Sequence, residues 1–279
     1  MNPLAVEQLT TANLTAVRAG RGPDLVVLHS LLTDRTAFDA VLPRLARHNR
    51  VTLFNLPGFH GSAPVGGDAP GEGGAPGEGR MAAYVACVRD GFDAFGIAPG
   101  AALMGNGFGG TVALAFALEH GDRLGRLVIS DAAAAFPEAG KQAFRVMAEK
   151  VAAGGVGAVA EIAASRVFHA DYLARHPGAI EERRRVLLGI EPSAFRAACR
   201  VLVETDLVPE LGRIRLPVLV ICGALDQATP PALNRVIAEA VPGARYVEMP
   251  GCGHCPPLEQ PDAFLSVLSA HAPELLPGP

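Results

Sequence analysis

A glycine-rich turn near the middle of the chain is the feature that most restricts what it can fold into. The segment Leu103–Gly110 is typical of a strand end, a sharp turn and a helix start, with glycine at positions 105, 107, 109 and 110. The centre of this turn is Gly107. Because glycine has no side-chain oxygen, no acyl-enzyme can form at that position. The turn therefore predicts the fold more clearly than it predicts the chemistry.

The composition fits a single α/β domain with an insertion. The chain has 279 residues, of which 49% are hydrophobic and 19% charged, so it can build a sizeable buried core. The formal net charge of -4 gives no reason to expect nucleic acid or an anionic membrane as a partner. Apolar runs such as Pro217–Cys222 are too short to span a bilayer. We expect a small-molecule substrate as the partner and no cofactor.

Two further patterns concern location. The segment Met1–Leu4 lacks a basic stretch followed by an apolar one, so we expect no secretory signal. The five cysteines, an odd number, show no disulfide-like framework, which is typical of a reduced protein inside the cell. These patterns predict a cytoplasmic protein and leave the oligomeric state open.

Strand-like and helix-like patterns alternate along most of the chain. Such alternation is typical of a parallel sheet covered by helices on both faces, here built from residues 1–135 and 212–279. Residues 136–211 are instead rich in Ala, Arg and Glu, with helical periodicity and no strand-like run, and they predict a helical lid over the strand ends. The expected strands are Leu25–His29, Val51–Leu56, Ala101–Met104, Arg126–Ser130, Pro217–Cys222 and Ala244–Met249, and the expected helices of the core are Thr36–Arg47, Met81–Phe95, Gly109–His120, Pro231–Val241 and Asp262–Ala270.

One segment, Gly66–Gly79, consists almost entirely of Gly, Pro, Ala and acidic residues and contains a tandem repeat. Such a segment cannot bury enough apolar area to order itself, which predicts a mobile surface loop. The alternative is a gate beside the pocket.

An aspartate and a histidine follow the last two expected strands. Asp226 comes four residues after the strand that ends at Cys222, and His254 lies in a glycine-containing loop after the final strand. Both positions fall at carboxyl ends of strands, where ligands bind in open α/β sheets. An aspartate that accepts a hydrogen bond from one imidazole nitrogen leaves the other nitrogen as a base. Taken singly, Asp226 could cap a turn and His254 could be a polar loop residue; together they predict a functional dyad.

These features resemble the motifs of α/β-hydrolases, and within that superfamily those of the 3-oxoadipate enol-lactonases. The glycine turn corresponds to the nucleophile elbow, and the order of elbow, Asp and His is the α/β-hydrolase order. The resemblance implies an α/β-hydrolase fold, with a mostly parallel central sheet, helices on both faces and an inserted lid. The matching stretches are His29–Asp34, Asn55–Ser62, Arg166–Phe168, Ala174–Pro177, Pro217–Pro231 and Gly253–Pro261.

The resemblance also implies roles for residues around the elbow. The backbone N–H groups of Phe108 and Leu31 are the expected oxyanion-hole donors. Ser30, His29 and the lid residue Val167 are expected to contact the substrate.

The chain departs from the family at four of these positions. Gly107 replaces the nucleophilic serine, which vacates the nucleophile site, and Asn55 replaces an aspartate. Val167 stands in place of a tryptophan and His29 in place of an asparagine. These changes put the lactone substrate in doubt and remove the covalent mechanism as the family uses it.

Other side chains could replace the missing nucleophile. Ser30 lies on the oxyanion loop and is the best alternative, although a turn residue whose hydroxyl bonds to nearby backbone is the more common role. Cys252 and Cys255 flank His254, and their spacing could in principle serve a thiolate, a metal or redox chemistry. With no second cysteine pair, we expect no metal site there.

Three functions agree with the sequence. The first is a carboxylic-ester or lactone hydrolase that the loss of the elbow serine leaves inactive or weakly active. The second is a serine-independent enzyme in which His254 and Asp226 act as a general base, for a lyase, C–C cleavage, decarboxylation or cofactor-free oxygenation reaction. The third is a non-catalytic small-molecule binder, which the retention of both Asp226 and His254 disfavours.

Overall fold

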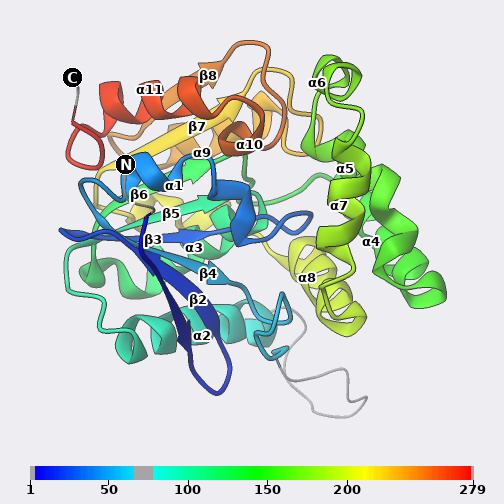
Figure 1. Ribbon diagram of the computed structural model, residues 1–279, viewed down its shortest axis with the longest axis horizontal. Coiled ribbons are helices and arrows are strands. Elements are labelled where there is room, and N and C mark those ends of the chain that lie inside the picture. The colour runs from blue at the N-terminus through cyan, green and yellow to red at the C-terminus, as the bar shows by residue number, and fades with distance from the viewer. Residues whose placement is uncertain (1–3, 66–77, 278–279) are drawn as a thin grey trace.

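An eight-stranded sheet forms the centre of the molecule. The computed structural model describes residues 4–65 and 78–277, so most of the repeat segment 66–79 lies outside the described residues. The sheet has the strand order β1-β2-β4-β3-β5-β6-β7-β8 (Figure 1). Pairing is antiparallel between β1 and β2 and between β2 and β4, and parallel elsewhere. The strands are β1 Val6–Thr10, β2 Thr15–Ala19, β3 Asp24–Leu28, β4 Arg50–Asn55, β5 Ala101–Asn106, β6 Leu124–Ser130, β7 Val218–Gly223 and β8 Arg245–Met249.

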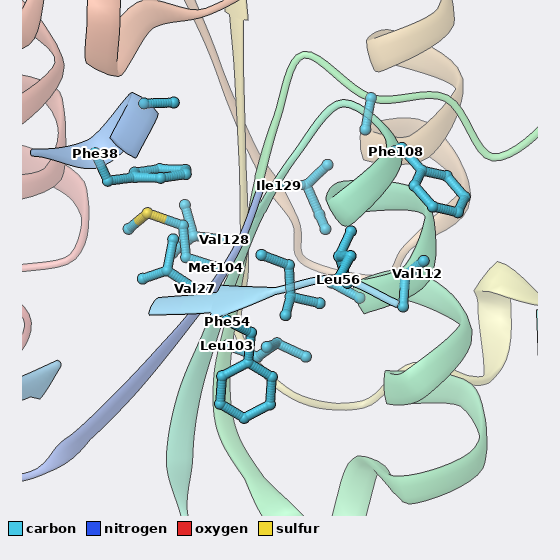
Figure 2. Close-up of a cluster of buried hydrophobic side chains, with 14 of the residues drawn as sticks. Val27, Phe38, Phe54, Leu56, Leu103, Met104, Phe108, Val112, Val128 and Ile129 are labelled. Carbon is cyan, nitrogen blue, oxygen red and sulfur yellow. The ribbon is translucent and has the colours of Figure 1, made fainter. Parts of the chain in front are cut away.

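The central strands are buried on both faces. Every residue of β3, β5 and β7 is buried, which requires helices above and below the sheet. Figure 2 shows the core around β3–β6, where Val27, Met104 and Val128 from neighbouring strands lie together on one face of the sheet. The mostly parallel α/β sheet expected from the sequence is therefore confirmed.

The helices outside the long insertion agree with the sequence pattern, with one exception. The span expected as one helix over Thr36–Arg47 is a 3-10 turn, Arg35–Phe38, followed by a single α-turn. Pro43 explains the break, because proline has no N–H to donate and fits only the first turn of a helix. The core helices are α1 Leu42–Leu45, α2 Glu78–Ala94, α3 Phe108–His120, α9 Pro231–Ala240, α10 Pro256–Glu259 and α11 Pro261–His271.

The N-terminal hairpin of β1 and β2 was not expected from the sequence. Four of the five β1 residues are exposed, because this strand lies at the edge of the sheet. An exposed edge strand needs no alternating apolar pattern, so its sequence, Val6–Thr10, carries little periodic signal.

Helices α4 to α8, which lie between β6 and β7 in the sequence, stand apart from the sheet as one group, drawn in green and yellow in Figure 1. Two isolated β-bridges, Phe59 with Ile190 and Ala135 with Asp206, join this insertion to the core. Among the described residues, no helix combines the length and the apolar character needed to cross a bilayer. The insertion helices are α4 Glu138–Gly154, α5 Ala160–Val167, α6 Ala170–Arg175, α7 Ala179–Leu187 and α8 Pro192–Glu204.

The glycine turn joins β5 to α3 through a close backbone approach. Gly107 precedes the helix with φ 54° and ψ −121°, a conformation that residues with a side chain rarely adopt. At Gly105, an added Cβ would lie 2.4 Å from the carbonyl oxygen of Gly109. The first turn of α3 can therefore sit against the end of β5 only because these positions lack side chains.

We predict that Gly105→Ala lowers the free energy of unfolding by about 2 kcal/mol or more, because its methyl group would overlap backbone that cannot move aside. Gly121→Ala is the matched control, since a Cβ there would lie 3.6 Å from the nearest atom, Leu216 Cδ2. We expect the control to change stability by less than about 1 kcal/mol. The check is the urea midpoint at unchanged m-value, and equal midpoints for the two variants would contradict the close approach.

Candidate functional site

Four residues singled out in the sequence lie at the carboxyl ends of strands. Ser30 follows β3, Gly107 lies between β5 and α3, Asp226 follows β7 and His254 follows β8. Carboxyl ends of parallel strands share one edge of the sheet. The fold therefore brings together Ser30 and His254, which are 224 positions apart in the sequence.

His254 and Asp226 form a buried, hydrogen-bonded pair. His254 Nδ1 lies 2.9 Å from Asp226 Oδ2, and the two side chains are 5% and 0% exposed. Because a carboxylate can only accept, Nδ1 of the neutral ring carries the proton and donates it. Nε2 on the other side of the ring is then unprotonated. The pair can act as a general base through Nε2.

A threonine that the sequence reasoning missed supports Asp226. Thr229 Oγ1 donates to Asp226 Oδ2 at 2.6 Å, while the amides of Ala228 and Thr229 donate to Oδ1 at 2.7 and 3.1 Å. Burial by itself would raise the pKa of Asp226, but the interaction with His254 and the hydrogen bonds from Thr229 outweigh it and lower the pKa. Asp226 is thus held as a carboxylate. The available signal was a threonine three residues after an aspartate, a spacing typical of side-chain-bonded turns.

A second buried acid, Asp131, lies behind Asp226. Its Oδ1 accepts from Gly223 N and its Oδ2 from Ser130 Oγ, both at 2.7 Å. Ligand atoms of Asp131, Cys222 and Asp226 lie within 4.8 Å of one another. Burial, and then the charge of Asp226, raise the pKa of Asp131 well above its usual value, which favours its neutral form. Burial also raises the pKa of the Cys222 thiol, which favours its protonated form beside the Asp226 carboxylate.

Backbone contacts hold the histidine loop in place. The amide of His254 donates to the carbonyl of Val167 at 3.2 Å. Asn106 Nδ2 donates to the carbonyls of His254 and Ser130 at 3.0 and 3.1 Å. Asn106, the residue before the elbow glycine, therefore ties the histidine loop to β5 and β6. The sequence pattern that could have indicated this role of Asn106 is an amide side chain in a strand whose other residues are apolar or glycine.

The Ser30 hydroxyl lies in the space that a side chain at position 107 would fill. Ser30 Oγ lies 3.3 Å from His254 Nε2, the nitrogen that the dyad leaves free. A Cβ added to Gly107 would lie 2.2 Å from Ser30 Oγ and 2.9 Å from His254 Nε2. The elbow glycine thus leaves room that the loop serine fills.

Both predicted oxyanion donors are available. Phe108 is the first residue of α3, so its N–H has no partner within the helix, and Leu31 lies in the turn after Ser30. Across the described residues, neither amide donates a hydrogen bond to a protein acceptor. Both residues line the same cavity as His254. Two free N–H groups beside a general base can stabilise a developing oxyanion.

The cavity at His254 is small, and both polar and apolar residues line it. Its volume is about 30 Å³, close to that of one water molecule, and the insertion contributes an apolar side to its wall. Arg166 of α5 lines this cavity and also a second hollow of about 150 Å³, which His254 lines too. The guanidinium of Arg166 forms no hydrogen bond or ion pair with a described residue. The apolar residues from the insertion are Phe136, Phe144, Met147 and Leu202.

A larger hollow lies away from His254. Its volume is about 630 Å³, and it lies between α1, α11 and the C-terminal segment, where Arg44, His48 and Ser266 line it. No predicted site residue lines this hollow, so its size does not locate the chemistry.

Two residues expected to contact the substrate are buried and contact the backbone. His29 is fully buried and both its ring nitrogens bond to backbone: Nε2 accepts from Leu56 N, and Nδ1 donates to Ser30 O, each at 2.9 Å. Val167 is fully buried in the core and contacts His254 through its carbonyl. Neither side chain is among the described residues that line the two cavities at His254. The substrate contacts expected of His29 and Val167 stay predictions.

The cysteines beside His254 are not activated. Cys252 and Cys255 are buried and free, and burial raises the pKa of both thiols, that of Cys255 to about 12. A thiol with a raised pKa holds its proton and is a poor nucleophile at neutral pH. The structure thus gives no support for these two thiols as nucleophiles.

We predict that His29 makes the fold sensitive to acid. Burial lowers its pKa from 6.5 to about 4, so below pH 6.5 the unfolded chain takes up a proton that the folded chain refuses. The free energy of unfolding should therefore fall by about 2 kcal/mol from this residue between pH 7 and pH 4.5. In His29→Asn this contribution to the loss of stability should vanish. The measurement is urea unfolding of both proteins at pH 7 and pH 4.5. Equal losses in the two proteins would contradict the assignment.

Comparison with known proteins agrees with this architecture. Residues 23–261 match the family described as alpha/beta hydrolase fold. The pimeloyl-[acyl-carrier protein] methyl ester esterase of Aeromonas hydrophila is 29% identical over 92% of this chain and 98% of its own length. The 3-oxoadipate enol-lactonase 2 of Acinetobacter baylyi is 30% identical over 62% of this chain and 63% of its own.

Solved structures give the same result. The enol-lactonase from Burkholderia xenovorans LB400 superposes with a TM-score of 0.83 at 27% identity, over 95% of this chain and 99% of that one. A thermophilic esterase from Thermogutta terrifontis has a TM-score of 0.82 at 27% identity, over 98% of this chain and 99% of that one. With its sheet order, its elbow turn and its Asp–His pair at the strand ends, the chain belongs to the α/β-hydrolase family.

Proposed function

We propose that this chain hydrolyses a small carboxylic ester or lactone, with His254 as general base and Asp226 as the residue that orients it. One observation carries the proposal: His254 Nε2 faces a cavity whose wall also holds the two free amides of Phe108 and Leu31. A base and an oxyanion hole in one small cavity are what acyl transfer requires. The esterase and lactonase relatives support the reaction class.

The proposed chemistry follows from the positions of these groups. His254 Nε2 removes the proton of the attacking hydroxyl while the oxygen of that hydroxyl bonds to the ester carbon. Asp226 stabilises the imidazolium that forms. The carbonyl oxygen gains negative charge and is bound by the N–H groups of Phe108 and Leu31. His254 then returns the proton to the departing alcohol oxygen. Gly107 supplies no hydroxyl to this sequence.

We further propose that the substrate carries a carboxylate. Arg166 is half-buried, lines both cavities at His254 and has no ion-pair partner among the described residues. A guanidinium in this position binds a carboxylate through two parallel hydrogen bonds. Phe144 and Met147 would contact the apolar part of the acyl group.

The insertion, residues 136–211, is proposed to act as a cap. A cavity of about 30 Å³ is too small for an ester, so side chains of α4 and α8 must move before a substrate can enter. The cap therefore opens for binding and closes to exclude water during the reaction.

A second candidate function uses the same dyad without a covalent step. Because Gly107 has no hydroxyl, His254 could abstract a proton from an acidic C–H or O–H group of the substrate, as in a lyase or C–C cleavage reaction. The two functions differ in one observable: only hydrolysis through a side-chain nucleophile leaves a covalent adduct on the protein.

We predict that the chain hydrolyses short p-nitrophenyl esters or an enol-lactone and that His254→Ala lowers kcat/KM on the order of 10³-fold or more. Asp226→Asn should lower it on the order of 10²-fold or more, because the ring is no longer held in the productive tautomer. The measurement is steady-state hydrolysis, with circular dichroism to check folding. Undiminished turnover by a folded His254→Ala protein would rule out the proposed base.

We predict that Arg166→Gln lowers kcat/KM roughly 10- to 100-fold for a p-nitrophenyl ester of glutaric acid, whose far carboxylate is free. The neutral p-nitrophenyl butyrate should change only a few-fold. Arg184→Gln, which removes an exposed guanidinium of α7, is the control and should affect neither ester. Equal losses with both esters would show that Arg166 does not bind the carboxylate.

A further inference from the structure

We propose that Ser30 is the nucleophile of this chain, a catalytic hydroxyl that reaches His254 from the loop after β3 and not from the elbow between β5 and α3. The inference rests on the proposed ester or lactone hydrolysis and assigns the one group that this reaction lacks. It is carried by the juxtaposition of Ser30, Gly107 and His254.

The hydroxyl is placed where a nucleophile must be. Ser30 Oγ lies 3.3 Å from His254 Nε2, and Nε2 is the ring nitrogen that the bond to Asp226 leaves unprotonated. Catalytic hydrogen bonds are often this long before substrate binds and shorten in the complex. The resulting chain of Ser30, His254 and Asp226 has the connectivity of a catalytic triad.

The same hydroxyl also lies beside the oxyanion donors. Ser30 immediately precedes Leu31, and Ser30, Leu31 and Phe108 all line the cavity at His254. A carbonyl carbon bonded to Ser30 Oγ would thus lie next to both free amides. This is the arrangement that an acyl-enzyme and its tetrahedral intermediate need.

The loop holds Ser30 rigidly in this position. Its carbonyl accepts from His29 Nδ1 at 2.9 Å and from Thr33 N at 3.3 Å, while its amide donates to Thr33 Oγ1 at 3.1 Å. The residue is 2% exposed. A buried serine whose backbone is bonded on both sides loses little further freedom when it reacts.

Ser30 and an elbow side chain compete for the same space. A Cβ at position 107 would lie 2.8 Å from Ser30 Cβ, closer than two such carbons approach in proteins. Two serines at these positions could not both keep the arrangement seen here. The glycine at 107 is therefore what admits the Ser30 hydroxyl to His254.

The proposed steps balance without any further reagent. Ser30 Oγ bonds to the carbonyl carbon while its proton moves to His254 Nε2; the carbon–oxygen bond to the alcohol then breaks, and the alcohol oxygen takes that proton. A water molecule gives a proton to His254 and adds to the acyl carbon. The bond from that carbon to Ser30 Oγ breaks, the acid leaves and Ser30 regains its proton.

The first test locates the covalent adduct. The full chain is treated with phenylmethanesulfonyl fluoride, digested with trypsin and examined by tandem mass spectrometry. The peptide from Gly22 to Arg35 contains two hydroxyls, those of Ser30 and Thr33, so fragment ions assign the adduct to one of them. We expect the sulfonyl group on Ser30, and we expect His254→Ala to prevent its attachment.

The second test moves the hydroxyl. Ser30→Ala should lower kcat/KM for p-nitrophenyl acetate on the order of 10³-fold or more. Ser266→Ala, at an exposed serine of α11 far from His254, is the control and should leave it unchanged. The double variant Ser30→Gly with Gly107→Ser should recover activity relative to Ser30→Ala. Its adduct should then appear on the peptide from Asp90 to Arg123, where the native chain has only the Thr111 hydroxyl.

The outcomes separate this proposal from the proposed function. Two results would overturn Ser30 as nucleophile but retain the proposed hydrolysis. One is hydrolysis that depends on His254 while Ser30 stays unlabelled, and the other is hydrolysis that survives Ser30→Ala in a folded protein. An adduct on Ser30 without turnover of any ester or lactone supports the nucleophile and overturns the substrate class. A chain that neither hydrolyses nor becomes labelled overturns both. A large gain from Gly107→Ser alone, with the adduct at 107, would identify a disarmed elbow instead and overturn Ser30.

Discussion

The close contact between the first turn of α3 and the ends of β3 and β5 is the constraint on which the site depends. Gly109 donates its N–H to the carbonyl of His29 at 3.0 Å, and a Cβ at Gly109 would lie 2.5 Å from that same oxygen. The helix start and the loop after β3 are therefore joined backbone to backbone. This contact sets how near Ser30 stands to position 107, and it directs the free amide of Phe108 toward the same cavity as Leu31.

Beside that contact, three buried side chains form a series in which each one affects the protonation or the orientation of the next. Asp131 is pushed toward its neutral form, Asp226 is kept as a carboxylate by its hydrogen bonds, and the imidazole of His254 is oriented by Asp226. The charge of Asp226 depends on Asp131 being neutral, because two carboxylates this close cannot both be charged at low cost. The Asn106 side chain and the Val167 carbonyl bond to the backbone of the histidine loop, so contacts from β5, β6 and α5 hold the segment that carries His254.

The sequence predicted the elements that have a periodic pattern. It missed the features that depend on one residue or on a contact between distant segments. The parallel strands, the elbow and the Asp226–His254 pair followed from periodicity and from position at strand ends. The exposed β1 edge and the break at Pro43 did not, since an edge strand has no apolar alternation and one proline interrupts an otherwise helical spacing. At the site, the roles of Asn106 and Asp131 were missed, because their hydrogen bonds join distant segments and leave no local spacing to read. Thr229 was missed although it lies only three residues after Asp226, because the same spacing also occurs in ordinary turns.

The backbone of the elbow has a consequence for where strain is stored. A turn with φ 54° and ψ −121° imposes a cost on the order of 1–3 kcal/mol on any residue with a Cβ, and enzymes that keep their reactive side chain there must offset it elsewhere in the fold. Here glycine adopts the turn without that cost, and the hydroxyl facing His254 belongs to a residue with no such backbone angle. The turn conformation and the hydroxyl at His254 thus belong to different residues, and the two positions remain linked because a Cβ at 107 would overlap the Ser30 side chain.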